Sequence, residues 1–256
     1  MNKTTKHRIK TAFWLVFLTG LGGVSLTAAR FQAGETIRDV VAEVVLADEG
    51  DNLIVPDEIV GMVTKKFGPL KDLPVDMVDM RTIETYLRTH PYVRDANVYL
   101  AANGELVLRL DQRIPRMRVV DNAGRHWYVD ADTIRMPVSR QYAARVPVVT
   151  GNFPAVDSAS KWNIAPMLQL TELFREDEFM AYLVDQVYVE SPEKIWLVPR
   201  MGPSRILIGT TDDLADKAER IRKWYRKALP AAGWDTYAYI DTRFAGQIVA
   251  RRKLNP

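Results

Sequence analysis

The chain has 256 residues, of which 47% are hydrophobic and 26% charged, a composition that excludes both a disordered chain and a multi-span membrane protein. The net charge of +3 comes from the first ten residues, which hold four Lys or Arg side chains and no acid. The remainder therefore carries −1, and a nucleic-acid-binding protein is not indicated. The absence of cysteine excludes a disulfide framework, a thiolate metal site and a cysteine nucleophile.

The first predicted element is a single membrane helix. Residues 11–29 form an uncharged, mostly apolar run between Lys10 and Arg30. A helix of this length spans about 28 Å, close to the roughly 30 Å of a bilayer's hydrocarbon core. Because the basic residues precede the run, the positive-inside rule predicts a cytoplasmic tail at 1–10 and places the rest of the chain, after the helix, outside the cytoplasm.

Two features of this run leave alternatives open. Residues 27–29, Thr-Ala-Ala, also suit a signal-peptide cleavage site, although the run exceeds the roughly 7–15 residues usual for such a core, which favours a retained anchor. Thr19, Gly23 and Thr27 recur every fourth residue and form a small-residue stripe suited to close helix packing. The stripe also has a simpler explanation, because Gly and Thr are common in membrane helices.

Residues 36–112 predict a first domain with the order strand, helix, helix, strand, strand. A Val- and Ile-rich strand covers 37–46, and Pro56 opens a helix that stops at Gly68. Asp79 caps a second helix. The last two strands alternate apolar residues on either side of Asn103-Gly104, which predicts a type I′ turn. A three-stranded sheet with two helices on one face accounts for this order.

The residues of this domain resemble a known family. Pro91-Tyr92-Val93, then Ala96-x-Val98, and finally 112–115, Gln-Arg-Ile-Pro, are similar to the POTRA domain of the FtsQ/DivIB division-protein family. POTRA domains are small interaction modules, so the resemblance implies a role in binding other proteins.

Residues 113–253 predict a second domain of strands with two helices. Short strands flank a turn near Asp121, and a helix is expected over 164–179. Thr210 and Thr211 predict the N-cap of a second, amphipathic helix that ends at Pro230 and Gly233, with Lys217 and Arg220 on its solvated face. A final hairpin is expected from strands at 237–244 and 247–251. Together the two domains predict an α+β protein.

The order of these segments is similar to the beta domain of FtsQ. The similarity covers the run Ile-Leu-Ile-Gly at 206–209, the amphipathic helix, and the terminal hairpin. One departure lies at 131–133, where Ala-Asp-Thr stands at a turn in which the family often has glycine.

The sequence contains no recognisable catalytic or metal-binding motif. His7, His90 and His126 show no metal-ligand spacing, and no nucleophile or phosphate-binding motif is present. Asp57, Glu58 and other acidic residues at helix starts are explained by capping and by the helix dipole. We therefore predict a protein that is not an enzyme and needs no cofactor, metal or small-molecule substrate.

The predicted functional feature is an edge strand at 247–251, where a partner strand can complete the sheet. The resemblance implies that the partner is the small coiled-coil protein FtsB, with FtsL bound to it. It also aligns Arg243 and Phe244 with an Arg-aromatic pair of that site, the arginine to meet a partner carboxylate. The candidate partner-binding residues are Arg243, Phe244, Gln247, Ile248, Val249 and Arg251.

Two of these residues have a simpler structural interpretation. Phe244 suits ordinary sheet packing, and Arg251 suits an edge charge that repels unwanted pairing.

The resemblance thus implies a scaffold of the inner membrane that links early and late division proteins at the septum, with its two domains in the periplasm. One alternative is a POTRA-containing secretion or assembly adaptor that holds client polypeptides. A third alternative is an anchored envelope enzyme, but no residue of the sequence can be nominated as catalytic.

Overall fold

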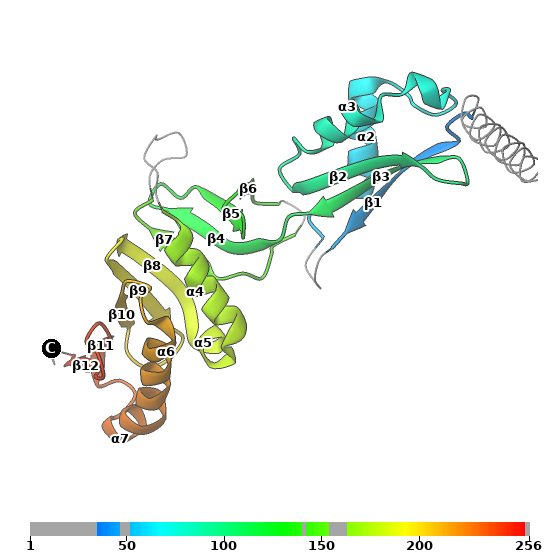
Figure 1. Ribbon diagram of the computed structural model, residues 1–256. Helices are drawn as coiled ribbons and strands as arrows, with labels where there is room; N and C mark the ends of the chain where they lie inside the picture. The colour runs from blue at the N-terminus through cyan, green and yellow to red at the C-terminus, as the bar shows by residue number, and fades with distance from the viewer. Residues whose placement is uncertain (1–34, 47–51, 140–141, 154–162, 254–256) are drawn as a thin grey trace, which may run out of the picture. The chain divides into compact units, whose positions relative to one another are not determined.

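The computed structural model describes residues 35–46, 52–139, 142–153 and 163–253 (Figure 1). These residues divide into two compact units, the first up to Gln112 and the second from Arg113 onward, with Asn52 and Leu53 grouped with the second. The predicted membrane helix at 11–29, its small-residue stripe and the basic tail lie outside the described residues. Within the described ranges, no helix is both long and apolar enough to cross a bilayer.

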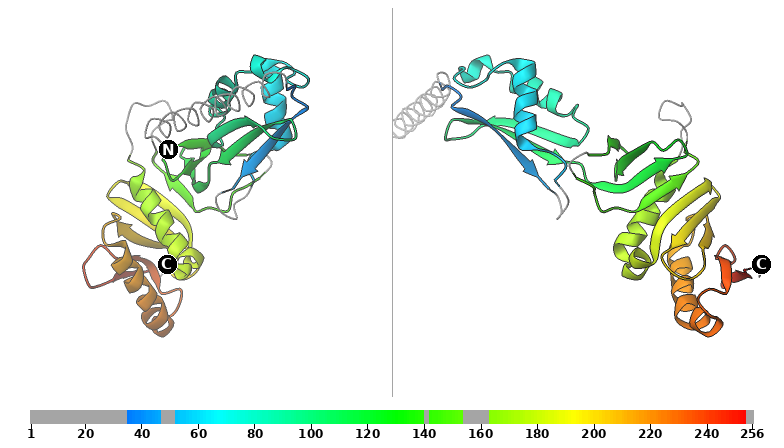
Figure 2. Two further views of the ribbon diagram at one scale, coloured as in Figure 1. Left: turned by 45° about the vertical axis from the view of Figure 1, so that its right-hand side comes forward. Right: turned by 180° about the vertical axis from the view of Figure 1, so that it is seen from behind.

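The first unit is a three-stranded sheet with its helices on one face (Figure 2). The strand order is β1-β3-β2, with β1 parallel and β2 antiparallel to β3. The elements are β1 (Asp39–Val45), α2 (Pro56–Phe67), a 3₁₀ turn (Val75–Met77), α3 (Met80–Leu87), β2 (Val93–Leu100) and β3 (Glu105–Gln112). The predicted order and sheet of this domain are confirmed.

Local sequence explains both helices of this unit. Pro56 stands in the first turn of α2, and Gly68 ends it with φ 85°, a conformation that favours glycine. Asp79 caps α3 by accepting a hydrogen bond from Thr82 N at 3.2 Å. The core is formed by side chains from both helices and from one face of the sheet: Ile59, Val63, Ile83, Leu87, Leu106, Leu108 and Leu110. Each such side chain contributes roughly 1.5–3 kcal/mol by leaving water.

The turn between β2 and β3 differs from the prediction. Gly104 N donates to Ala101 O at 2.9 Å, so Ala102 and Asn103 are the central residues, and neither has positive φ. Gly104 follows in the left-handed region at φ 84°. This is a type I turn followed by a glycine bulge, and the type I′ prediction was wrong because the reversal starts one residue earlier.

The second unit is built on one nine-stranded mixed sheet, with the order β12-β11-β10-β9-β8-β7-β4-β5-β6. β4, β7 and β8 run parallel to one another, as do β10 and β11, and the other neighbours are antiparallel. The strands are β4 (Pro115–Asp121), β5 (His126–Asp130), β6 (Arg135–Pro137), β7 (Val148–Gly151), β8 (Val184–Ser191), β9 (Lys194–Pro199), β10 (Arg205–Gly209), β11 (Tyr237–Asp241) and β12 (Val249–Arg252).

Helices cover one face of this sheet and share a single core with it (Figure 1). Met167 and Leu170 from the first helix and Ala218 and Ile221 from the third are buried in that core. The helical segments are α4 (Ala165–Glu176), α5 (Glu178–Leu183), α6 (Leu214–Lys223), a π-helical turn (Trp224–Ala228) and α7 (Leu229–Ala232).

The predicted helix over 164–179 is in fact two helices. α4 ends at Glu176, and the carboxylate of Asp177 accepts from Met180 N at 3.1 Å to cap α5. The apolar content that suggested one helix belongs to two segments that meet at this cap.

The start of α6 also differs from the prediction. Thr210 Oγ1 donates to Asp212 at 2.7 Å instead of capping, and Asp213 precedes the helix with φ 51°. Pro230 does not stop the helix. It stands in the first turn of α7, directly after the π-helical turn, where a residue without a backbone N–H is tolerated. Gly233 ends α7, as predicted.

The turn at 131–133 forms without glycine. Thr133 takes the left-handed position at φ 65°, which is uncommon for a β-branched residue. The carboxylate of Asp130 holds the turn by accepting from Ile134 N at 2.8 Å and by pairing with Arg113 at 2.8 Å.

Candidate functional site

The described residues form no group of three or more His, Cys, Asp or Glu side chains suited to a metal ion. His90 and His126 belong to different units, and His7 lies outside the described ranges. His90 is half-buried in the first unit, and burial lowers its pKa.

The free edge of β12 is the feature on which the predicted site depends. β12 is the last strand of the sheet order and pairs only with β11 among the described residues. Val249 is 46% exposed, and Arg251 and Arg252 are exposed beside it. The backbone of one side of this strand therefore lacks a described neighbour.

The hairpin that carries this edge is shorter than predicted. β11 ends at Asp241 and β12 begins at Val249, so Gln247 and Ile248 lie in the connecting loop 242–248 and not in the strand. Gly246 has φ 71°, and Gln247 N donates to Phe244 O across the tight turn. The apolar pattern extended the predicted strand too far, because Ile248 packs against the core from the loop and not from a strand.

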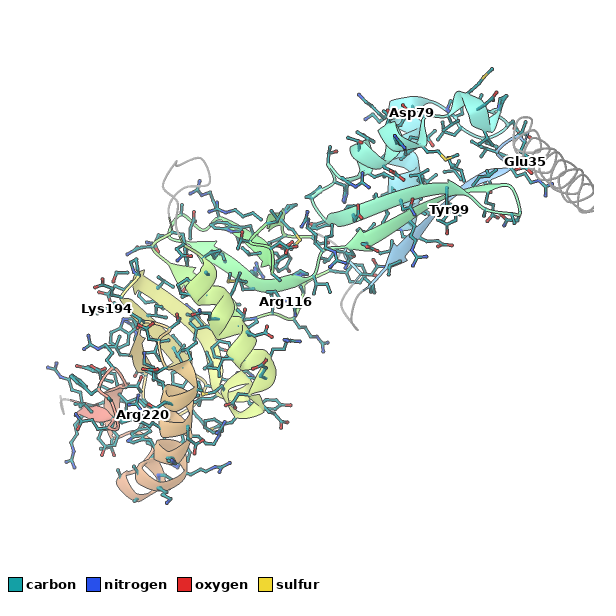
Figure 3. The ribbon with its side chains drawn as sticks, viewed as in Figure 1. Glu35, Asp79, Tyr99, Arg116, Lys194 and Arg220 are labelled. Atoms are coloured by element: carbon teal, nitrogen blue, oxygen red, sulfur yellow. The ribbon has the colours of Figure 1, made fainter. Side chains whose placement is uncertain are left out.

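Arg220 of α6 holds this loop. Its guanidinium donates to three carbonyl oxygens of the loop, those of Phe244 (2.7 Å), Gln247 (2.6 Å) and Thr242 (3.1 Å). Figure 3 shows Arg220 on the side of α6 that faces the hairpin. Its side chain is only 11% exposed, so the prediction of a solvated residue was wrong. Loop carbonyls without a strand partner need donors, and one arginine supplies several.

Lys217 is likewise not on a solvated face. It is buried, and its Nζ donates to Thr210 O at 2.9 Å, which ties the start of α6 to the end of β10. Burial lowers the pKa of Lys217, and the nearby carboxylates of Asp212 and Asp213 oppose that shift.

Arg243 meets a carboxylate of its own chain. Its guanidinium lies 2.7 Å from Asp241 Oδ2, and it passes over Gly209, where an added Cβ would lie 2.8 Å from the Arg243 side chain. Burial by itself would raise the pKa of Asp241, but hydrogen bonds from Arg243 hold it below its ordinary value. A partner carboxylate would therefore have to share this arginine with Asp241.

Phe244 is 46% exposed and lies beneath the guanidinium of Arg243, which is 6.0 Å from the ring centroid. The ring is therefore half available to another molecule. A hollow of about 320 Å³ adjoins this loop, lined by Arg220, Lys223, Trp224, Gly246, Gln247 and Ile248. Trp224 stacks at a tilt on Tyr237 of β11, with centroids 5.6 Å apart.

The structure thus brings Arg243, Phe244 and Val249 to one end of the sheet, with Gln247 and Ile248 in the hollow beside them. Arg220 and Trp224 also belong to this region, although neither was predicted from the sequence. No local sequence pattern predicts the role of Arg220, because its carbonyl partners lie 22 to 27 positions later in the chain.

Comparison with known proteins agrees with this architecture. Residues 114–251 match the family model described as FtsQ/DivIB, C-terminal related, and residues 41–111 match a POTRA-like domain. A cell division protein FtsQ of Rhodothermus marinus is 24% identical over 257 aligned positions, covering 98% of this chain and 91% of that protein. A cell division protein FtsQ of Salinibacter ruber is 25% identical over 176 positions, covering 64% and 66%. The chain belongs to the FtsQ/DivIB family.

Proposed function

We propose that this chain is a non-enzymatic scaffold of the bacterial division machinery that binds a partner by strand addition at the free edge of β12. FtsB/FtsL-type proteins are the proposed partners. The predicted helix at 11–29 tethers the scaffold in the inner membrane at the septum, where it links early and late division proteins. Membership of the FtsQ/DivIB family and the similarity to two cell division proteins support a role in cell division.

The observation that carries this proposal is the position of β12 at the end of the nine-stranded sheet. An added strand gains main-chain hydrogen bonds whatever its sequence, and side-chain pockets beside the edge supply specificity. Phe244 and the hollow beside Ile248 are placed to supply such specificity, and a half-exposed aromatic ring suits an interface anchor.

Cysteine cross-linking tests the proposal directly, because the chain has no cysteine of its own. Val249→Cys places one thiol on the edge, and Met77→Cys, at a residue that is 75% exposed in the first unit, is the matched control. A series of single cysteines along the terminal segment of an FtsB-type partner is oxidised against each variant.

Strand pairing predicts that Val249→Cys cross-links strongly at alternate partner positions, because strand side chains repeat every second residue. Met77→Cys should give no such pattern. Equal cross-linking of both variants, or a pattern repeating every three to four partner positions, would show that the partner does not add a strand here.

A further inference from the structure

A second concave region of the second unit has a different character. It is a cavity of about 530 Å³ at the amino-terminal ends of the parallel strands β4, β7 and β8, roofed by α4 and α5. It shares no lining residue with the hollow beside β12. A cavity of this size holds a ligand larger than a single inorganic anion.

Arginines surround this cavity. Arg116 comes from β4, Arg145 from the segment before β7, Arg175 from α4 and Arg200 from the residue after β9. Asp185 is the one acidic side chain in the lining. Even with Glu172, which bonds to Arg175, the site carries four cations against two anions.

Two of these arginines are available for a ligand. Arg175 bonds to Glu172, and Arg200 lies 3.7 Å from Asp185. Arg116 and Arg145 form no ion pair within the described ranges, and Arg145 is exposed. Two guanidinium groups without a carboxylate partner are an anion-binding arrangement.

Arg116 lies at a strand irregularity, because Pro115 pairs with Asp130 and Met117 with Val129, which gives β4 one extra residue at this point. The burial of β4 still alternates here, with Pro115 and Met117 buried and Arg116 half-buried. Figure 3 places Arg116 beside α4, and its charge lowers the pKa of Glu172 on that helix, after the larger effect of Arg175. Arg116 therefore lies at the cavity although Met117 and Val119 fill the core.

Apolar side chains also line the cavity, beside its polar ones. Val146, Pro147 and Val148 line one side, and Phe174 and Val184 line another. A ligand that satisfies both features presents carboxylates to the arginines and an apolar group between them. An acidic polypeptide segment has both parts, with carboxylates for the arginines and an apolar side chain for Val146, Val148 and Phe174.

We propose that this cavity binds an acidic segment of a partner polypeptide, in which carboxylates flank at least one apolar side chain. The site is separate from the edge of β12, and the chain has room for two partners on its second unit. Arg116 and Arg145 are the residues that bind the carboxylates.

The test is selection from a random peptide library against the immobilised full chain. Peptides selected by the wild type should be enriched in Asp and Glu around an apolar residue. They should bind Arg116→Gln/Arg145→Gln about tenfold or more weakly, because each arginine supplies charge-assisted hydrogen bonds. The control Arg81→Gln/Arg109→Gln removes the same charge from exposed arginines of the first unit and should bind as the wild type does.

A second measurement does not depend on the fold of a variant. Selected peptides resynthesised with Asn and Gln in place of Asp and Glu should bind the wild type about tenfold or more weakly. Absence of acidic enrichment, or equal binding to all three proteins, would overturn the proposal. So would retention of phosphatidylglycerol liposomes by the wild type and not by Arg116→Gln/Arg145→Gln, which would assign the site to lipid headgroups. Peptide binding that survives Phe244→Ala separates this site from the edge of β12.

Discussion

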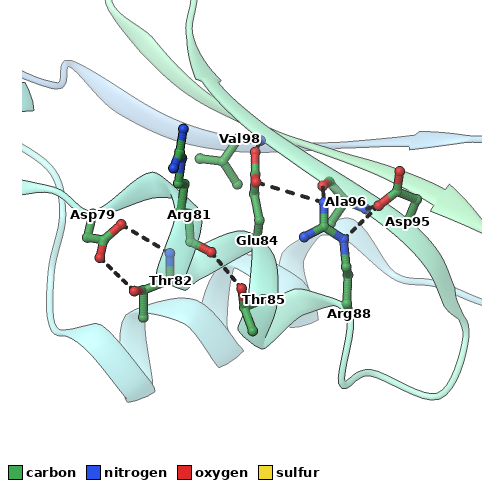
Figure 4. Close-up of polar contacts among 9 residues, drawn as sticks. All are labelled: Asp79, Arg81, Thr82, Glu84, Thr85, Arg88, Asp95, Ala96 and Val98. Atoms are coloured by element: carbon green, nitrogen blue, oxygen red, sulfur yellow. Dashed lines mark hydrogen bonds and ion pairs between the residues drawn. The ribbon is translucent and has the colours of Figure 1, made fainter.

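Two edge strands of this molecule, β2 in the first unit and β12 in the second, differ in whether side chains cover their outward backbone groups. Both strands lie at the end of their sheet. On β2, Val98 N donates to Glu84 Oε1 at 2.9 Å, and Ala96 O accepts from Arg88 Nη2 at 2.7 Å (Figure 4). Side chains of α3 thus occupy the backbone groups that would pair with an added strand.

On β12 no such cover is present within the described ranges. The nearest side-chain bonds, those from Arg220, reach the loop before the strand and leave Val249–Arg252 untouched. An edge strand alone therefore does not mark a docking site. What matters is whether neighbouring side chains already satisfy its outward backbone groups.

The largest expected effect comes from a proline on the open edge. Lys253 N donates toward β11, to Thr236 O at 3.0 Å, so alternation turns the N–H of Ala250 outward. Ala250→Pro should weaken partner binding about 100-fold or more, because it removes an outward donor, and should change stability little. Binding by titration calorimetry and unfolding in urea measure the two effects.

Arg251→Pro is the matched control. Its N–H is expected to face β11, so this variant should lose unfolding free energy through a broken ladder bond. Similar binding by Ala250→Pro and the wild type would mean that the edge of β12 is not used.

The next effect concerns the arginine that holds the loop. Arg220→Met removes the donor of three hydrogen bonds to loop carbonyls and should lower the unfolding free energy of the second unit by about 2–3 kcal/mol. Denaturant unfolding measures this change. Arg226→Met removes an exposed arginine of the same helical stretch and should cost less than about 0.5 kcal/mol. Equal losses in both variants would rule out a positioning role for Arg220.

Removing the side chains that cover the edge of β2 should make that edge open to strand pairing, as the edge of β12 is. Glu84→Leu with Arg88→Met frees Val98 N and Ala96 O, which should cost about 1–2 kcal/mol and promote self-association through β2. Sedimentation velocity measures the association. Arg81→Met, on the exposed side of α3, should stay in the wild-type state. A double variant that remains unassociated would mean that these side chains do not guard the edge.

The smallest effect is a pH dependence of the open edge. Hydrogen bonds from Arg243 outweigh burial and hold the pKa of Asp241 below its ordinary value of about 3.9. A lowered native pKa stabilises the fold above the unfolded value and loses that contribution as the pH falls through the native pKa. Stability should therefore drop below about pH 4, and Arg243→Met should reduce this drop in urea unfolding at pH 3 and pH 7. An unchanged pH profile in Arg243→Met would exclude the pair as its source.

Much of the fold was predictable because its information is local. Alternating leucines at 106, 108 and 110 identified β3, and Pro56 and Asp79 marked the starts of α2 and α3. The buried position of Lys217 could also have been predicted by the same reasoning. It lies three residues after Leu214 and four before Ile221, within the apolar stripe, so helical periodicity places it against the core.

The candidate site was predictable only in part. Alternation and turn residues predicted a terminal hairpin with Phe244 before its last strand, although that strand begins at Val249 and not at Gln247. Tertiary structure decided that this strand has no described neighbour on one side, that Arg243 turns to Asp241, and that Arg220 holds the loop. Caps, turns and periodicity depend on residues a few positions apart in the sequence, so they can be read from it. A sheet edge and its hydrogen-bond donors depend on segments that are far apart in the sequence and meet only after the sheet has formed.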